Sequence, residues 1–492
     1  MKKYTFFFIL IMLGTLLGLN NCTTNPATGK KSFTAFMSRE DEVRIGTEEH
    51  PRLIKEFGGI YKNTRLQAYV IRVGLRLANQ ADDSGLKYTF TILNSEKVNA
   101  LALPGGFIYI TRGLLALVEN EAELAGVLAH EIGHVTARHT AERYSTAKAT
   151  NLGMMMLNVL SSATGVPTGV NQLLGFGAEA ALKSYSRDQE LESDMLGVNY
   201  LVRAGYSPFA MTSFFHKLKA HEKLESKLKG SPNFIPNNIF ATHPRTVDRI
   251  KKAVRLANNF NIKNSVLKRE TFLKEIDGIT FGDDPEQGIR SGRKFIHRDL
   301  GISFEVPPNF ILFNSPTQVV ARGPRGTKML FQLKQEKSIG RRISLEEHIT
   351  NTWSKIFSLK KLEHININGL KAITSRSYLN GKDYRLIAIQ GDKNLYFHLV
   401  FISSPSITSK LNTDFRRATY SFRRLSKSEA DAIEPLRIKV IKTVPGDTQK
   451  KLAKKMPFEA YRLEWLQTLN GLLPGQEILP GRSLKVVVKD YK

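Results

Sequence analysis

The chain has 492 residues, of which 41% are hydrophobic, a single cysteine and a formal net charge of +27 at pH 7. This composition excludes an intrinsically disordered chain and a small scaffold held by disulfides, and the length predicts about three domains. A basic surface attracts polyanions or is simply solvated, but no helix-turn-helix, zinc-knuckle or aromatic–basic RNA motif is present, so we predict no nucleic-acid partner.

The N-terminus has the pattern of a bacterial export signal. Two lysines precede an apolar run at residues 4–19, which is short for a membrane span, so we predict a signal peptide over residues 1–21. Cys22 stands where bacterial lipoproteins are cleaved and lipidated, although Asn21 replaces the usual small residue before it. We therefore predict lipidation of Cys22 and a linker over residues 22–37. Simple secretory cleavage and an uncleaved anchor are the alternatives.

A short β-prone run follows a Pro-Gly-Gly turn at residues 104–106. The run consists of Phe107, Ile108, Tyr109 and Ile110. A strand of this kind can bind an extended peptide through main-chain hydrogen bonds. The alternative is an internal strand of a small sheet, and the two interpretations are compatible.

The next predicted helix carries the motif H-E-x-x-H. Apolar residues recur at helical spacing from Leu124 to Val135, which predicts a core helix. His130 and His134 are four residues apart, lie on one face of that helix and can bind one Zn²⁺. Glu131 lies beside them and is placed to take a proton from an attacking water. The motif also arises by chance, so it needs support from the rest of the chain.

A second predicted helix offers the missing ligand. Ser186 and Gln189 form a capping box, which places Glu190 in the first turn and Asp194 one turn further on the same face. A catalytic zinc site needs a third protein ligand, which Glu190 can supply. Asp194 can accept the free N–H of a ligating imidazole. The alternative, an ordinary acidic helix surface, is disfavoured by the two histidines upstream.

These features resemble the Ste-type/HtpX/Oma-type gluzincin metallopeptidases, in the branch of a bacterial periplasmic protease that supports β-barrel assembly. The resemblance covers roughly residues 37–256. It rests on four separated blocks in the same order, at residues 99–115, 123–139, 186–194 and 242–244. The resemblance implies a mainly α-helical zincin-type domain with a small β-sheet.

The resemblance also implies roles for single residues. His130, His134 and Glu190 are expected to bind one Zn²⁺ per chain. Glu131 is expected to act as the general base, and Asp194 to support a ligating histidine.

A histidine in the Thr-His-Pro block of this family lies near the metal. The resemblance therefore implies that His243 either stabilises the oxyanion or occupies the open metal position and holds the enzyme latent. From the residues alone, a turn residue is the alternative. Arg249 is predicted to pair with Asp194 or with the transition-state charge. We expect His139 to turn away from the metal face of its helix and to be structural.

We expect a multidomain fold with three folded parts. They are a metallopeptidase domain at 38–277, an α+β domain of unknown role at 293–428 and a LysM-like βααβ domain at 436–490. The LysM-like part resembles modules that are often associated with peptidoglycan sugars. An interaction module or a purely structural module is the alternative, since a fold does not determine a function.

The predicted function is a zinc-dependent endopeptidase that hydrolyses misfolded or stalled outer-membrane proteins in the bacterial periplasm. Its expected partners are protein substrates, the membrane through a lipid anchor, and peptidoglycan. Thr23 is not Asp, which by analogy favours the outer membrane. The alternatives are a latent zinc-bearing adaptor or chaperone that acts by binding, and a peptidoglycan-associated factor.

Overall fold

In the computed structural model of this protein, the described residues are 22–24, 28–83, 85–150, 184–228, 239, 243, 247–258, 260, 265–336, 343–392 and 394–489. The predicted signal peptide and the side chain of Cys22 lie outside this description. The chain divides into two compact units. Unit 1 consists of Met1–Lys55, Gly59–Phe281 and Arg437–Lys492, and unit 2 consists of Glu56–Gly58 and Gly282–Leu436.

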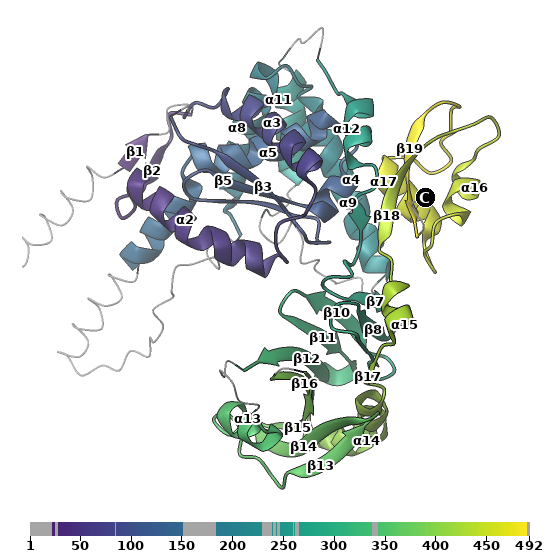
Figure 1. Cartoon of the computed structure of the whole chain (residues 1–492). Coiled ribbons are helices and arrows are strands. Elements are labelled where there is room, and N and C mark those ends of the chain that lie inside the picture. Colours follow the sequence, from purple (N-terminus) through teal and green to yellow (C-terminus); the bar gives the residue numbers. More distant parts are fainter. Residues whose placement is uncertain are drawn as a thin grey trace, which may run out of the picture. The chain divides into compact units, whose positions relative to one another are not determined.

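Unit 1 is mainly helical (Figure 1). Its helices are α2 (Arg39–Glu56), α3 (Thr64–Ala78), α4 (Arg112–Leu117), α5 (Glu121–Thr136), α8 (Arg187–Arg203), α9 (Phe209–Leu228), α11 (Val247–Asn258), α12 (Arg269–Ile276), α16 (Gln449–Lys454) and α17 (Arg462–Asn470). Its strands are β1 (Cys22–Thr24), β2 (Lys31–Phe33), β3 (Thr89–Leu93), β4 (Ala100–Leu103), β5 (Phe107–Thr111), β6 (Thr280–Phe281), β18 (Leu436–Lys442) and β19 (Ser483–Val488). Among the described helices of the whole chain, none combines the length and the apolar character that crossing a bilayer requires.

The predicted strand after the Pro-Gly-Gly turn is β5, and it is the central strand of a three-stranded sheet. It runs parallel to β3 and antiparallel to β4, so both of its hydrogen-bonding edges are occupied. Phe107, Ile108, Tyr109 and Ile110 therefore cannot pair with a peptide through their main chain, and that interpretation is corrected. The internal strand is the alternative that holds. β4 is an outer strand of this sheet.

The metal-motif helix α5 packs closely against α8. All 16 residues of α5 are buried, and Asn120 caps its N-terminus by accepting a hydrogen bond from the Glu123 amide at 2.9 Å. The capping box predicted at the start of α8 is present. A Cβ atom added to Gly133 of α5 would lie 2.8 Å from the Ser193 hydroxyl oxygen of α8. The two helices can therefore approach so closely only because glycine stands at this contact.

The C-terminal segment has the expected strand–helix–helix–strand order, from β18 through α16 and α17 to β19. It is not isolated from the helical part of the chain. β18 and β19 are antiparallel (Figure 1). β18 also lies beside β6, the two-residue strand at Thr280–Phe281. The segment therefore shares a sheet with a strand that lies just beyond the predicted peptidase domain at 38–277.

A buried lysine joins this segment to α4. The Lys485 Nζ atom donates hydrogen bonds to the carbonyl oxygens of Ala116, Leu117 and Val118, at 2.8, 3.1 and 2.6 Å. These carbonyls end α4, where helical carbonyls have no partner of their own. Burial lowers the pKa of Lys485 well below its usual value. The C-terminal strand thus caps the helix that leads into α5.

Unit 2 is built from antiparallel sheets and short helices (Figure 1). Its strands are β7 (Ile289–Ser291), β8 (Lys294–His297), β9 (Ile302–Glu305), β10 (Ile311–Ser315), β11 (Gln318–Arg322), β12 (Lys328–Gln335), β13 (Glu363–Ile367), β14 (Leu370–Leu379), β15 (Lys382–Gln390), β16 (Leu395–Ser403) and β17 (Arg423–Arg424). Its helices are α13 (Leu345–Thr352), α14 (Pro405–Tyr420) and α15 (Lys427–Asp431). The larger sheet has the order β10-β11-β12-β16-β15-β14-β13, and the smaller has the order β17-β9-β8-β7.

The larger sheet buries apolar side chains on both faces. Phe397 and Phe401 of β16 belong to one core with Phe415 of α14, while Tyr396 of the same strand belongs to a second core with Trp353 after α13. This alternation follows from the two-residue period of a strand.

We predict that Lys485→Met lowers the free energy of unfolding of unit 1 by about 1–3 kcal/mol, because buried carbonyls lose their donor. The measurement is urea unfolding followed by Trp465 fluorescence in a Trp353→Phe background, since these are the two tryptophans of the chain. Lys489→Met, at an exposed position just beyond the same strand, is the matched control. Equal midpoints for the two variants would contradict the capping role of Lys485.

Candidate metal centre

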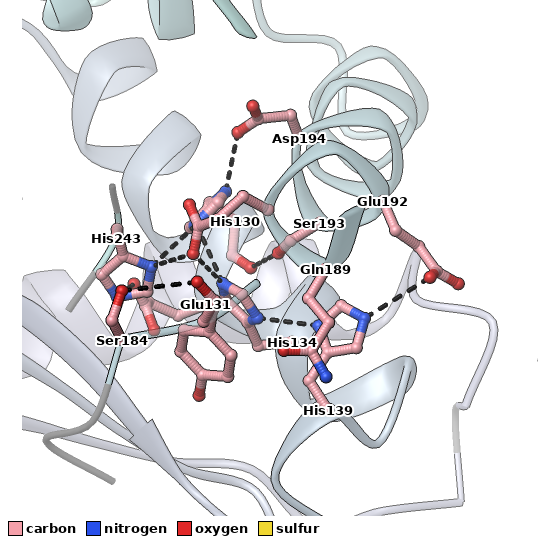
Figure 2. Close-up of polar contacts among 12 residues, drawn as sticks. His130, Glu131, His134, His139, Ser184, Gln189, Glu192, Ser193, Asp194 and His243 are labelled. Carbon is pink, nitrogen blue, oxygen red and sulfur yellow. Dashed lines mark hydrogen bonds and ion pairs between the residues drawn. The ribbon is translucent and has the colours of Figure 1, made fainter. Parts of the chain in front are cut away.

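Two histidines of α5 and one glutamate of α8 meet inside unit 1. The Nε2 atoms of His130 and His134 are 3.0 Å apart, and the Glu190 carboxylate lies 3.6 Å from the first and 3.4 Å from the second. All three side chains are buried. Figure 2 shows the two histidines next to each other. The structure thus brings together the three side chains that the sequence spacing predicted as metal ligands.

The spacing of these donor atoms fits a metal ion. Ligands about 2.0–2.1 Å from one tetrahedral ion lie about 3.3 Å apart. The separations observed here range from 3.0 to 3.6 Å. Imidazole nitrogens and a carboxylate are also the donor types that transition-metal ions such as zinc prefer. His130, His134 and Glu190 can therefore hold one divalent metal ion.

Asp194 contacts His130 at Nδ1, the ring nitrogen that does not face the other donor atoms, and Arg249 binds Asp194. The Asp194 carboxylate lies 2.9 Å from His130 Nδ1 and accepts two hydrogen bonds from Arg249, at 2.7 and 2.8 Å. Arg249 also forms an ion pair with Glu190. Burial opposes ionisation of Asp194, but the Arg249 charge lowers the pKa of this carboxyl below its usual value. An ionised Asp194 keeps the proton on His130 Nδ1, which leaves Nε2 free to bind a metal.

Glu131 is the unusual carboxylate of the site. Within the described part of the chain, neither of its oxygens has a hydrogen-bond partner, and its side chain is fully buried. Burial raises its pKa above the usual value. The Glu131 side chain borders a cavity together with His130, His243 and Arg249. The rest of the cavity wall is mostly apolar and consists of Gly126, Val127, Met211, Phe214, Phe215, Leu218 and Ile239.

His243 lies inside the cluster of donor atoms. Its Nδ1 atom is 3.2 Å from His130 Nε2 and 2.9 Å from the Glu190 carboxylate, and its Nε2 atom is 3.4 Å from Glu131. Burial lowers the pKa of His243, but the nearby Glu190 and Glu131 carboxylates outweigh it, so the pKa is raised. His243 therefore stands where a fourth ligand would be. Its neighbours in the Thr-His-Pro block fall outside the described residues.

His139 does not turn away from the metal face, contrary to the expectation from helical spacing. Its Nδ1 atom lies 2.8 Å from the Nδ1 atom of His134. The expectation assumed that the helix continues, but α5 ends at Thr136, and Arg138 adopts a left-handed conformation with φ of 57°. This turn of the chain brings His139 back behind the ligand.

Tyr185 is a neighbour of the site that sequence reasoning missed. Its ring stacks on the His134 imidazole, with ring centroids 3.7 Å apart and an angle of 20° between the planes. Tyr185 is buried and immediately precedes the Ser186 cap of α8. In the sequence, the only indication of this contact is that Tyr185 stands directly before the predicted helix that carries Glu190.

We predict that Asp194→Asn weakens metal binding about 10- to 100-fold, because the amide no longer fixes His130 in its metal-binding form. Competition with a chromophoric chelator measures the change in affinity. The exposed Asp188→Asn, in the first turn of the same helix, is the control. Thermal unfolding of the chelator-treated proteins checks that both variants are folded. Unchanged affinity in a folded Asp194→Asn protein would contradict the supporting role.

Comparisons with known proteins agree with this geometry. Residues 64–257 match peptidase family M48. The chain is 31% identical over 234 residues to a β-barrel assembly-enhancing protease of Yersinia pestis, and the alignment covers 46% of either protein. The protein of the same name from Escherichia coli (strain K12) is 29% identical over 246 residues, with 49% of this chain and 48% of the relative covered. The mitochondrial metalloendopeptidase OMA1 of Schizosaccharomyces pombe is 27% identical over 256 residues, with 51% and 71% covered.

The alignment thus spans about half the length of the bacterial relatives. The matches confirm the family resemblance inferred from four sequence blocks, and they leave the LysM-like interpretation of residues 436–490 a prediction. The metal donors, Glu131 and His243 all fall inside the matched segment. Residues 64–257 are the part of this chain that is similar to peptidase family M48.

Proposed function

We propose that the chain is a zinc-dependent endopeptidase of the bacterial cell envelope. The observation that carries this proposal is the Glu131 carboxylate beside three metal donors. A buried carboxylate without hydrogen bonds is costly, and such groups concentrate at functional sites. The donor set of two imidazoles and one carboxylate is a common one for catalytic Zn²⁺. We therefore assign one Zn²⁺ per chain to His130, His134 and Glu190.

The residues of the site then divide the work of peptide hydrolysis. When bound, Zn²⁺ supplies Lewis-acid polarisation of the water and of the scissile carbonyl. Glu131 takes the proton from the attacking water and later delivers it to the amine that leaves. Asp194 and Arg249 hold His130 in its metal-binding tautomer. The raised pKa of Glu131 suits a group that both accepts and donates a proton.

The proposed substrate-pairing strand is β4 in place of β5. Among the described strands β4 is an outer strand of its sheet, so its outer edge can pair with an extended peptide. Ala102 and Leu103 of β4 line a small hollow together with His134 and Tyr185. A peptide along β4 would therefore run toward the metal donors.

For His243, we propose the latent role over the oxyanion role. Its Nδ1 atom lies among the donor atoms of the proposed zinc ligands, and its other ring nitrogen faces Glu131. In this conformation the imidazole would take the fourth metal position and crowd the general base. Movement of His243 out of the cluster would open the site to water and substrate.

The cellular setting is part of the same proposal. We propose a lipid anchor at Cys22, a location at the periplasmic side of the outer membrane, and misfolded or stalled outer-membrane proteins as substrates. The similarity to β-barrel assembly-enhancing proteases supports this substrate class. We also propose that residues 436–490 contact peptidoglycan, on the basis of their strand–helix–helix–strand order.

We predict that Glu131→Gln lowers kcat/KM for an unfolded protein such as casein on the order of 10²- to 10⁴-fold, because the amide cannot accept the proton. Zinc affinity should stay close to that of the unmodified chain. Glu48→Gln, at an exposed position of α2, is the control.

The same variant separates the enzyme from an adaptor that acts only by binding. Loss of both proteolysis and the cellular phenotype in Glu131→Gln supports the enzyme. A full phenotype without proteolysis would refute it in favour of the adaptor.

We predict that His243→Ala raises kcat/KM against casein, because removal of the imidazole opens the fourth metal position. A donor to the oxyanion would instead show a loss of about 10²- to 10³-fold. The exposed His216→Ala of α9 is the control. Steady-state kinetics of the two variants therefore decide between the two roles.

A further inference from the structure

A row of polar contacts runs from the metal donors to the N-terminal segment of unit 1. His134 Nδ1 lies 2.8 Å from His139 Nδ1, and His139 Nε2 lies 3.5 Å from the Glu192 carboxylate. Figure 2 shows this row leading away from the donor cluster on the side opposite His243. All three side chains are buried. None of them except His134 belongs to the proposed metal ligands.

The positions of the protons determine which group donates and which accepts along this row of contacts. Two ring nitrogens 2.8 Å apart share one proton, so one of them donates and the other accepts. His134 can bind a metal through Nε2 only if its proton sits on Nδ1. His139 must then accept at Nδ1 and carry its own proton on Nε2, which faces Glu192. The reverse arrangement would put a proton on His134 Nε2, among the donor atoms.

Glu192 is in turn held by the N-terminal segment. Its carboxylate accepts hydrogen bonds from the Thr28 hydroxyl at 2.8 Å and from the Lys30 ammonium at 2.9 Å. These two residues directly precede β2, which pairs with β1, the strand that begins at Cys22. The segment that the proposed lipid anchor would tether therefore supplies the groups that orient Glu192.

We propose that His139, Glu192 and Lys30 are positioning residues that fix the metal-binding tautomer of His134, so that the docked N-terminal segment contributes to metal affinity. The inference rests on the metal site of the proposed function and does not depend on proteolysis. It assigns the segment after Cys22 a second task besides that of a linker. If this segment were displaced, Glu192 would lose its hydrogen bonds to Thr28 and Lys30. The metal-binding tautomer of His134 would then be less firmly fixed.

The test measures metal binding by the full exported chain. We expect Glu192→Gln to raise the apparent Kd for Zn²⁺ about 10- to 100-fold, as is typical when the partner of a ligating histidine is removed. Lys30→Met should raise it less. Lys31→Met is the matched control, because Lys31 is the next residue and is exposed. The second readout is the visible absorption of Co²⁺ bound in place of zinc, which reports the geometry of the ligands.

Variants of His139 separate positioning from mere packing. His139→Gln keeps an acceptor and a donor in one side chain and should retain much of the affinity, whereas His139→Leu should lose it. A purely structural role would lower the Tm of the chelator-treated protein and leave the Kd and the Co²⁺ spectrum of the folded protein unchanged. That result in Glu192→Gln and Lys30→Met would overturn the inference.

Failure of the inference and failure of the proposed function give different results. If the variants lose affinity and no proteolysis is found in the unmodified chain, the positioning role stands and the peptidase proposal falls. If the unmodified chain binds neither Zn²⁺ nor Co²⁺, both are overturned.

Discussion

The close approach of α5 and α8 is the constraint on which the metal centre depends. Gly133 and Gly197 lie at this contact, and a Cβ atom at either would come within 3.1 Å of atoms of the opposite helix. The Ser193 hydroxyl also donates a hydrogen bond to the His130 carbonyl at 2.5 Å, which ties the two helices at the same level. The donor atoms are separated by little more than 3 Å, so a small shift of α5 or α8 would disrupt their arrangement. The contact therefore sets the geometry of the ligands before any ion binds.

The same small volume holds carboxylates in two different electrostatic states. Glu190 is buried, yet the charges of His243 and Arg249 keep its pKa well below the usual value. Asp194 behaves in the same way because of Arg249, whereas burial dominates for Glu131 and raises its pKa. Environment alone thus lowers the pKa of two carboxyl groups and raises the pKa of a third, and a raised pKa suits the proton exchange that we propose for Glu131. Loss of Arg249 would leave Asp194 without its main counter-charge and Glu190 without one of its two, a change that is strongly destabilising in proteins.

Local patterns in the sequence were sufficient to predict that His130, His134 and Glu190 lie together, and insufficient for the residues around them. Glu190 and Asp194 could be predicted because a capping box marks where α8 begins and helical spacing then sets the face. His139 was misjudged because one left-handed residue, Arg138, ends the helical register that the prediction extended. The role of β5 was misjudged because strand pairing depends on residues far apart in the chain. Lys485, a charged residue within a buried strand, has contacts that no local pattern could have indicated.

The distance along the chain between that lysine and the helix it caps has a consequence for the order of folding. Lys485 and Val118 are 367 residues apart, and closing so long a loop is slow relative to forming local structure. During synthesis β19 emerges after α4 and α5 have already been made. The end of α4, just before α5, consequently lacks its cap until the chain has been made as far as Lys485. The boundary between α4 and the helix that carries His130 and His134 is therefore completed late in folding.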